Sequence, residues 1–313
     1  MKKNKIFLLP LFVLILAICL FIVSQIFYTK NETNSLMMLI EFEEVDGILQ
    51  WEKELDKRGL TALVKVQDNV LEENEEVFKR LAEKGYEIAG GYDEAPFWDM
   101  PYEEQYQHLR NSQELVERVT GKKMRVFGSR YFAYDENTLK IADDLGIEYI
   151  LARGTEDVEA IVYKPNEYNV KIISVTNVDV GEMGRGSLCD YSLWARGSSP
   201  EDFWQMIEES VAKDPKNMIL VSHSYLGGTR LLWWQEYIKA LDLPDLNWKG
   251  FDGWILNQDI EYLNNEDIPI NREVKYVAPN PVKQIEEYEA IPGLEDLNKK
   301  INSQNKEGEM LCQ

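Results

Sequence analysis

Short apolar segments alternate with longer amphipathic ones along most of this chain, and this alternation limits the folds that it can adopt. Strand patterns occur at residues 36–40, 61–66, 86–89, 124–127, 147–151, 160–163, 170–175 and 218–222. Helical patterns occur at residues 48–57, 70–84, 102–120, 135–145, 200–212 and 231–241. Strands separated by helices of this length pair in parallel through right-handed crossovers. We therefore predict an α/β fold, a distorted parallel (β/α) barrel of about seven strands.

The beginning of the chain has a different character. Lys2, Lys3 and Lys5 precede an uncharged, mostly apolar run over residues 6–27, which is long enough to cross the roughly 30 Å hydrocarbon layer as a helix. No small-x-small cleavage site follows it. We therefore expect one uncleaved transmembrane signal anchor in the cell membrane, with the lysines in the cytoplasm and the remaining chain outside. A cleaved signal peptide and a lipidated Cys19 are the alternatives.

These patterns also predict the domain boundaries. We expect a cytoplasmic basic tip over residues 1–5, the signal anchor over 6–28, a tether over 29–35 and the barrel over 36–280. Residues 281–313 are rich in Glu, Lys, Asn and Gln, and we expect a poorly ordered polar tail there. The 34 basic and 55 acidic residues give a net charge of −21, which argues against a nucleic-acid partner. Pairing between Cys189 and Cys312 stays open.

The loop after the third strand is a candidate site. We expect the strand over residues 86–89 to stop at the Gly90-Gly91 pair. Tyr92, Asp93 and Glu94 follow it in the sequence. Sites in parallel α/β folds lie on the loops at the carboxyl ends of the strands, so these side chains are candidates for binding or catalysis. An acidic surface turn is the alternative interpretation.

Residues from about 37 to 241 resemble the polysaccharide deacetylase family, whose members are carbohydrate esterases that remove N- or O-acetyl groups from chitin, peptidoglycan and related polymers. The family phrase Thr-Phe-Asp-Asp corresponds here to Glu41-Phe42-Glu43-Glu44. The phrase Gly-His-Glu-Ile-Gly-Asn-His, followed by Ser-x-x-His-Pro phrasing, corresponds to the residues from Gly85 to Pro96. Phe-Arg-Pro-Pro-Tyr-Gly corresponds to Phe127-Gly128-Ser129-Arg130-Tyr131-Phe132, and the last Leu-x-His phrase to Leu220-Val221-Ser222-His223.

The resemblance implies a metal-dependent reaction, but the chain departs from the family at the metal. In the family, an Asp and two His hold a divalent ion, usually zinc, that polarises the acetyl carbonyl and activates a water. Glu44 matches the metal-binding Asp, whereas Gly91 and Ala95 match the two His and supply no ligand. The resemblance therefore identifies a divergent member in which most metal-binding and catalytic positions are replaced.

The remaining matches give the candidate site residues. The resemblance makes Glu43 the catalytic base and His223 the general acid, while Gly128 replaces a supporting arginine that Arg130 could supply from two positions along. Glu44 and Asp93 are candidate ligands for Ca²⁺, Mg²⁺ or Mn²⁺, because sites made of carboxylates favour these ions over zinc. The candidates for contacts with sugar rings are aromatic: Tyr92, Trp98, Tyr131, Trp194 and Trp233.

Each of these residues also has an alternative interpretation as a structural or surface residue without a role in function. The acids could form a solvated strand end, His223 could be a core histidine satisfied by the backbone, and the tryptophans could be core residues. The functional interpretation requires Glu43, Glu44, Asp93, Arg130 and His223 to converge in one pocket. The alternative scatters them towards solvent or the backbone.

Three functions remain open from the sequence. The first is a membrane-anchored, extracytoplasmic protein that acts on or binds acetylated cell-wall or extracellular polysaccharide, hydrolysing carbon–nitrogen bonds other than peptide bonds if it is active. The second is a catalytically inactive glycan-binding pseudoenzyme. The third is a glycosidase-like hydrolase in which Glu43 works with Asp93 or Glu94 as a carboxylate pair. A polysaccharide or glycan is the expected partner in each case.

Overall fold

The computed structural model describes residues 32–41, 45–154, 158–270 and 281–294. The compact domain begins at Thr33. The predicted membrane span lies outside the described residues, as do Glu43 and Glu44. Within the described part of the chain, no helix is both long and apolar enough to cross a membrane.

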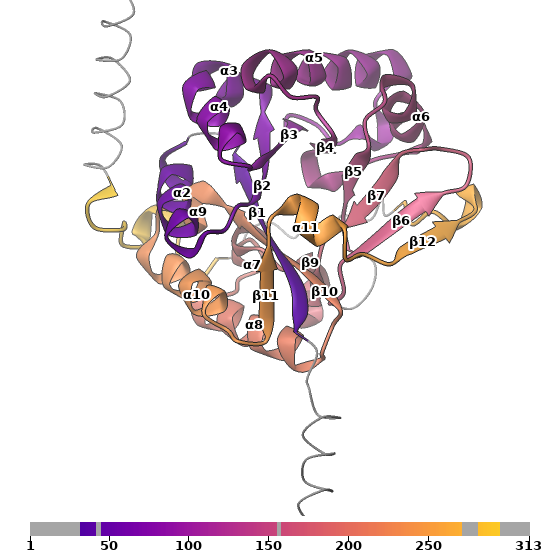
Figure 1. The fold of residues 1–313 in the computed structure, drawn as a ribbon. Helices are drawn as coiled ribbons and strands as arrows, with labels where there is room; N and C mark the ends of the chain where they lie inside the picture. The colour runs from indigo at the N-terminus through magenta and orange to yellow at the C-terminus, as the bar shows by residue number, and fades with distance from the viewer. Residues whose placement is uncertain (1–31, 42–44, 155–157, 271–280, 295–313) are drawn as a thin grey trace, which may run out of the picture. The chain divides into compact units, whose positions relative to one another are not determined.

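Ten strands of the described chain form one curled sheet (Figure 1). All neighbouring strands are parallel except β6 and β7. The predicted α/β class and the curled, mostly parallel sheet are therefore confirmed, and β11 and β12 are additional strands. The order is β10 (Asn217–His223), β1 (Thr33–Glu41), β2 (Leu63–Gln67), β3 (Glu87–Tyr92), β4 (Val126–Ser129), β5 (Tyr149–Ala152), β7 (Lys171–Ser174), β6 (Ile161–Pro165) and β12 (Ile260–Leu263), with β11 (Leu246–Lys249) also paired to β1.

Helices cover the outer face of this sheet. Figure 1 shows α3, α4 and α5 along one side and α8 and α10 along another. The predicted helix over residues 70–84 is divided at Asn74, whose side-chain amide donates to the carbonyl of Val70 at 2.9 Å. The helices are α2 (Asp46–Arg58), α3 (Asp68–Glu73), α4 (Glu75–Glu83), α5 (Tyr102–Thr120), α6 (Glu136–Leu145), α7 (Asp190–Trp194), α8 (Pro200–Ala212), α9 (Ser224–Gly227), α10 (Leu231–Leu241) and α11 (Phe251–Ile255). A separate hairpin joins β8 (Asn177–Asp179) and β9 (Arg185–Ser187).

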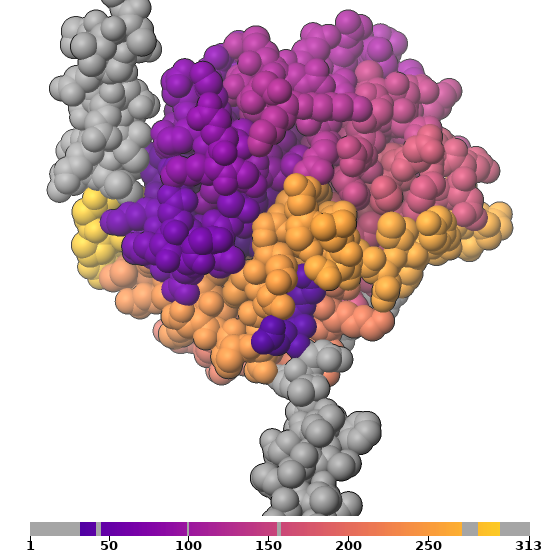
Figure 2. Space-filling model, in the orientation of Figure 1, coloured from indigo at the N-terminus to yellow at the C-terminus, as the bar shows by residue number. Residues whose placement is uncertain are grey.

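Two apolar cores lie on opposite faces of the sheet, because side chains alternate along each strand. The outer core joins the sheet to the helices, and the inner core fills the curl. Phe251 and Trp254 of α11 belong to the inner core. The Trp254 indole donates to the carbonyl of Asn34 at 3.2 Å, so α11 packs at the amino-terminal end of β1. Figure 2 shows this orange segment at the surface, near the centre of the view.

Strand β3 does not stop at the Gly90-Gly91 pair as predicted but continues to Tyr92. The two glycines are needed for packing on opposite faces. A Cβ at Gly90 would lie 3.0 Å from the Cβ of Ser112 in α5. A Cβ at Gly91 would lie 2.8 Å from the carbonyl oxygen of Val66 in β2. The pair therefore marks close packing of the strand, not its end.

The predicted polar tail also differs from the structure over residues 281–294. Four apolar side chains in this segment are buried and join the outer core, namely Ile285, Tyr288, Ile291 and Leu294. The backbone N–H of Ile291 donates to the carbonyl of Thr229 at 2.8 Å. The segment folds against the domain because these widely spaced apolar residues reach the core, although its overall composition is polar.

Candidate functional site

The candidate site lies at the carboxyl ends of the central strands. In the pairing of β1 with β2 and β10, Ile40 is aligned with Lys65 of β2 on one side and with His223 of β10 on the other. Residues two positions earlier on these strands, Leu63 and Val221, belong to the inner core. Because side chains alternate, Lys65 and His223 also face the inside of the curl. The site is therefore built at one level of the barrel, just above its apolar filling.

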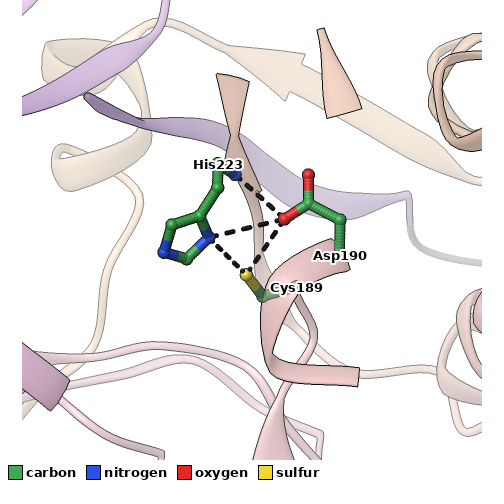
Figure 3. Close-up of side chains that lie close together, drawn as sticks. All are labelled: Cys189, Asp190 and His223. Carbon is green, nitrogen blue, oxygen red and sulfur yellow. Dashed lines mark hydrogen bonds and ion pairs between the residues drawn. The ribbon is translucent and has the colours of Figure 1, made fainter. Parts of the chain in front are cut away.

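His223 is held by two residues at the start of α7 (Figure 3). Its Nδ1 lies 3.1 Å from the sulfur of Cys189 and 3.4 Å from Oδ1 of Asp190. The carboxylate favours the imidazole tautomer that carries its proton on Nδ1, which leaves Nε2 as the ring's acceptor. The rings of Tyr191 and Tyr225 lie 4.9 and 6.0 Å from the imidazole between centroids. Asp190 thus orients a histidine that is bordered by half-buried aromatic rings.

Hydrogen bonds from neighbouring groups also hold the Asp190 carboxylate in place. Its side chain is fully buried, and its Oδ1 accepts hydrogen bonds from the backbone N–H groups of Tyr191 at 2.6 Å and His223 at 2.9 Å. The Ser222 hydroxyl donates to Oδ2 at 3.0 Å. A buried carboxylate needs such donors, because each one offsets part of the loss of hydration. The loop and the strand end are therefore joined through Asp190.

Cys189 is a buried, free cysteine. Burial, with the charge of Asp190 as a second cause, raises the pKa of its thiol well above the ordinary value. A thiol with a raised pKa is a poor nucleophile, because the reactive form is the thiolate. Cys189 therefore contributes packing and a polar contact with His223, and the geometry does not favour nucleophilic chemistry at its sulfur.

Asp93, a predicted metal ligand, forms an ion pair with the ammonium of Lys65. The Lys65 side chain is 2% exposed and that of Asp93 is 15% exposed. Two glycines make room for the lysine. A Cβ at Gly91 would lie 3.2 Å from Cγ of Lys65, and one at Gly128 would lie 3.3 Å from Cδ.

The predicted catalytic Arg130 lies near the same loop. Its guanidinium donates to the backbone carbonyl of Glu94 at 2.9 Å and stacks on the ring of Tyr131, 5.1 Å from the centroid. Tyr131 and Phe132 have φ values of 60° and 53°, which is a strained backbone region for residues other than glycine. Arg130 therefore connects the turn after β4 to the loop after β3, and Tyr131 remains half-buried beside it.

The other predicted aromatic contacts have different environments. Tyr92 is half-buried and packs on the imidazole of His108, 3.9 Å between centroids, and Trp98 is also half-buried. Trp194 is mostly buried, and its indole donates to the carbonyl of Lys283 at 2.9 Å. Trp233 has no exposed surface. A fully buried ring presents no face to a sugar, so the position of Trp233 does not support its predicted role.

The predicted convergence is therefore seen only in parts. Lys65 and Asp93 form one group, and Cys189, Asp190 and His223 form another. Glu43 and Glu44 lie outside the described residues. The sequence analysis missed Asp190, because it begins the short helix α7, which no predicted element covered. It also missed Lys65, although a lysine inside the apolar strand Leu63–Gln67 was a signal.

The metal site that the resemblance implies does not fit this chain. Gly91 and Ala95 carry no donor atoms, and the space beside Gly91 is filled by Lys65 and the Val66 carbonyl. Asp93 is engaged by an ammonium. Among the described residues, the only close cluster of potential ligands is Cys189, Asp190 and His223. Its atoms are accounted for by the hydrogen bonds described above, so the arrangement itself gives no reason to assign an ion there.

Comparison with known proteins confirms the resemblance. Residues 50–150 match the model of the polysaccharide deacetylase family. The fold is similar to that of a protein assigned as a polysaccharide deacetylase from Mycobacterium smegmatis, with a TM-score of 0.55 and 12% identity over 76% of this chain and 96% of the other. A second, from Pseudomonas aeruginosa PAO1, gives a TM-score of 0.56 and 14% identity over 72% and 91%.

The same fold also occurs in a protein of a different activity. The structure of Puue allantoinase gives a TM-score of 0.57 and 12% identity over 74% of this chain and 91% of that one. None of the curated protein sequences matches the chain. The structural similarities therefore establish the fold, and the chemistry must be argued from the side chains.

Proposed function

We propose that this polysaccharide-deacetylase-like protein is a membrane-anchored, extracytoplasmic glycan-binding protein that recognises acetylated cell-wall or extracellular polysaccharide without the metal-dependent hydrolysis of the family. The observation that carries this proposal is the replacement of both metal-binding histidines. Gly91 and Ala95 offer no ligand, and Lys65 fills the space beside Gly91. A site with this composition keeps the position of the family's site but lacks the group that activates water there.

The polar and aromatic groups at the carboxyl ends of the central strands, which we call the barrel mouth, support a sugar as the ligand. Asp93 is partly exposed beside half-buried Tyr92, and the rings of His223, Tyr191 and Tyr225 cluster with one another. Sugars are recognised by hydrogen bonds to their hydroxyl and acetamido groups and by contacts of their C–H surfaces with aromatic rings. The strongly negative net charge disfavours acidic polymers, so a neutral acetylated glycan is the better match.

Binding and hydrolysis can be separated in one experiment. The full-length protein is titrated with an N-acetylglucosamine tetramer in EDTA. Acetate release is then measured on the same preparation in EDTA and, after removal of the EDTA, with added Zn²⁺ or Mn²⁺. The proposal predicts saturable binding and no acetate above the level without protein. Metal-dependent release of acetate, or the absence of binding to acetylated oligosaccharides and polymers, would contradict it.

The second candidate is a hydrolase that works without a metal. It is favoured by the Asp190–His223 pair, because a histidine oriented by a buried carboxylate can act as a general acid or base. This candidate predicts acetate release that EDTA leaves unchanged and that His223→Ala abolishes. Gln107→Ala, an exposed residue of α5, is the control and should leave the activity unchanged. Equal activity in the His223 variant and its parent would exclude this role.

The proposed location depends on residues 1–27. Lys2, Lys3 and Lys5 before the apolar run support a single span with its amino terminus in the cytoplasm. Mass spectrometry of the protein extracted from membranes should find these residues intact. A mature chain that begins after residue 27 would show a cleaved signal peptide, and a lipid on Cys19 would show a lipoprotein. Either result would contradict the proposed anchor.

A further inference from the structure

Lys65 occupies an unusual place for a lysine. It lies in the middle of an apolar strand and faces the inside of the barrel, and only 1% of the surface of the whole residue is exposed. Burying an ammonium is costly unless a partner and hydrogen bonds compensate for the lost hydration. The partner is Asp93, 28 positions further along the chain and beyond the end of β3. The cost of burying Lys65 and its specific pairing with Asp93 indicate that the lysine has a role at the site.

The surroundings of Lys65 explain how it fits. Its stem passes the two glycines, Gly91 and Gly128, and neither could carry a side chain without contacting it. In the family that the chain resembles, a metal-binding histidine stands at the position of Gly91, and the arginine that supports the catalytic base stands at the position of Gly128. The lysine stem therefore runs through the space where those side chains would begin, and its charge lies next to the carboxylate.

We propose that Lys65 is the fixed cation of this site: it replaces a metal ion as the partner of Asp93 and positions that carboxylate as a hydrogen-bond acceptor for a ligand at the barrel mouth. The ammonium itself is nearly inaccessible, whereas the Asp93 side chain is 15% exposed. Lys65 is thus a positioning residue, and Asp93 is the residue that meets the ligand.

The chemistry of Asp93 identifies the class of ligand. An ionised carboxylate only accepts hydrogen bonds, so the ligand must donate them. Hydroxyl and amide N–H groups of a neutral sugar do so, and a carboxylate-bearing sugar would be repelled by the acidic chain. This assignment rests on the proposed glycan-binding function. The Lys65–Asp93 pair does not depend on it and can be tested separately.

The test is a double-mutant cycle on the full-length protein in EDTA. Binding of the N-acetylglucosamine tetramer is measured by calorimetry for the parent, Lys65→Met, Asp93→Asn and the double variant. We expect each single substitution to weaken binding at least tenfold, and the double variant to bind no more weakly than Asp93→Asn. Lys53→Met, an exposed lysine on α2, is the matched control and should bind like the parent.

Two results would overturn the binding role. Lys65→Met could bind like the parent, or the effects of the two substitutions could multiply, which would show that Lys65 does not act through Asp93. A stoichiometric metal ion in the parent that Asp93→Asn abolishes would overturn the replacement of the metal by Lys65. A metal that persists in Asp93→Asn and is lost in Cys189→Ser would belong to the buried cluster and would leave the assignment intact.

Thermal unfolding of the same four proteins distinguishes this proposal from the proposed function. Each single substitution leaves a buried charge without its partner, so the double variant should be more stable than the two separate effects predict. Refolding of an unstable Lys65→Met protein by the second substitution would support the pair equally well. If the parent binds no glycan, the proposed function fails, while coupled unfolding still supports the Lys65–Asp93 pair. Additive unfolding effects would overturn the pair itself.

Discussion

Lys65 and His223 lie at the same level of the barrel, on either side of Ile40. Two strand spacings separate their Cα atoms by roughly 9–10 Å. Each side chain is engaged by a carboxylate, Asp93 for the lysine and Asp190 for the histidine. The two carboxylate-paired side chains therefore lie at one level of the curled sheet, in the region where the family holds its metal ion. The predictions below examine the parts of this arrangement.

Asp190 should be essential for local structure. Asp190→Ala removes the acceptor for the Ser222 hydroxyl and for the backbone N–H groups of Tyr191 and His223. Leaving buried donors unsatisfied costs about 1–3 kcal/mol each, so we expect a loss of roughly 3 kcal/mol in the free energy of unfolding. Asp190→Asn should lose less, because its amide oxygen still accepts. Denaturant unfolding measures both, and an alanine variant as stable as the parent would contradict the role.

Gly91 should tolerate no side chain. Gly91→Ala places a methyl group 2.8 Å from the Val66 carbonyl oxygen and 3.2 Å from Lys65. Overpacking of this kind typically costs roughly 1–3 kcal/mol, so the melting temperature should fall. Gly253→Ala is the matched control, since its nearest neighbour would lie at 3.6 Å. If both variants melt like the parent, the close packing around Lys65 is not real.

The pH dependence of stability should contain a contribution from Asp68, on α3. Burial raises the pKa of this carboxyl from 3.8 to about 6. Between these values the folded chain holds a proton that the unfolded chain has released, so the free energy of unfolding falls as pH rises through this window. Asp68→Asn should remove that fall and should stabilise the protein at pH 7 by roughly 1–3 kcal/mol. Unfolding measured at pH 4 and pH 7 checks this, and an unchanged pH dependence would contradict it.

Cys189 should resist alkylation in the folded protein. Its burial and the neighbouring Asp190 raise the pKa of the thiol, so little thiolate forms at pH 8. Iodoacetamide labelling followed by mass spectrometry should modify Cys189 slowly, and rapidly once denaturant is added. Labelling at equal rates in both conditions would indicate an exposed thiol and a different environment for His223.

The sequence predicted the parts of the fold that depend on local patterns. The periodicity indicated α5 and α10 at their observed bounds, and Asp135, the first residue of another predicted helix, is the N-cap of α6. Strand β12 was missed, because it is short and largely exposed and has no apolar run. Within the predicted polar tail, residues 281–294 fold against the domain because a few separated apolar residues anchor them, while residues 295–313 lie outside the described part of the chain.

The candidate site was less predictable, because its contacts join distant parts of the chain. His223 was recognised from the Leu-x-His phrase of the resemblance, but its partner Asp190 lies 33 positions earlier, at the start of the short helix α7 that the periodicity did not indicate. Lys65 could be noticed as a lysine among apolar residues. Its path past Gly91 and Gly128, however, depends on the alignment of three neighbouring strands. Pairing of this kind is a property of the folded sheet.

The most direct test of the central claim is a crystal structure of the domain soaked with Zn²⁺ or Mn²⁺, with anomalous scattering recorded at the metal edge. We predict that the Lys65 ammonium lies within hydrogen-bonding distance of the Asp93 carboxylate and that no anomalous peak lies next to Asp93. An anomalous peak coordinated by Asp93, with the Lys65 side chain turned away from it, would contradict the claim that a lysine takes the place of the metal.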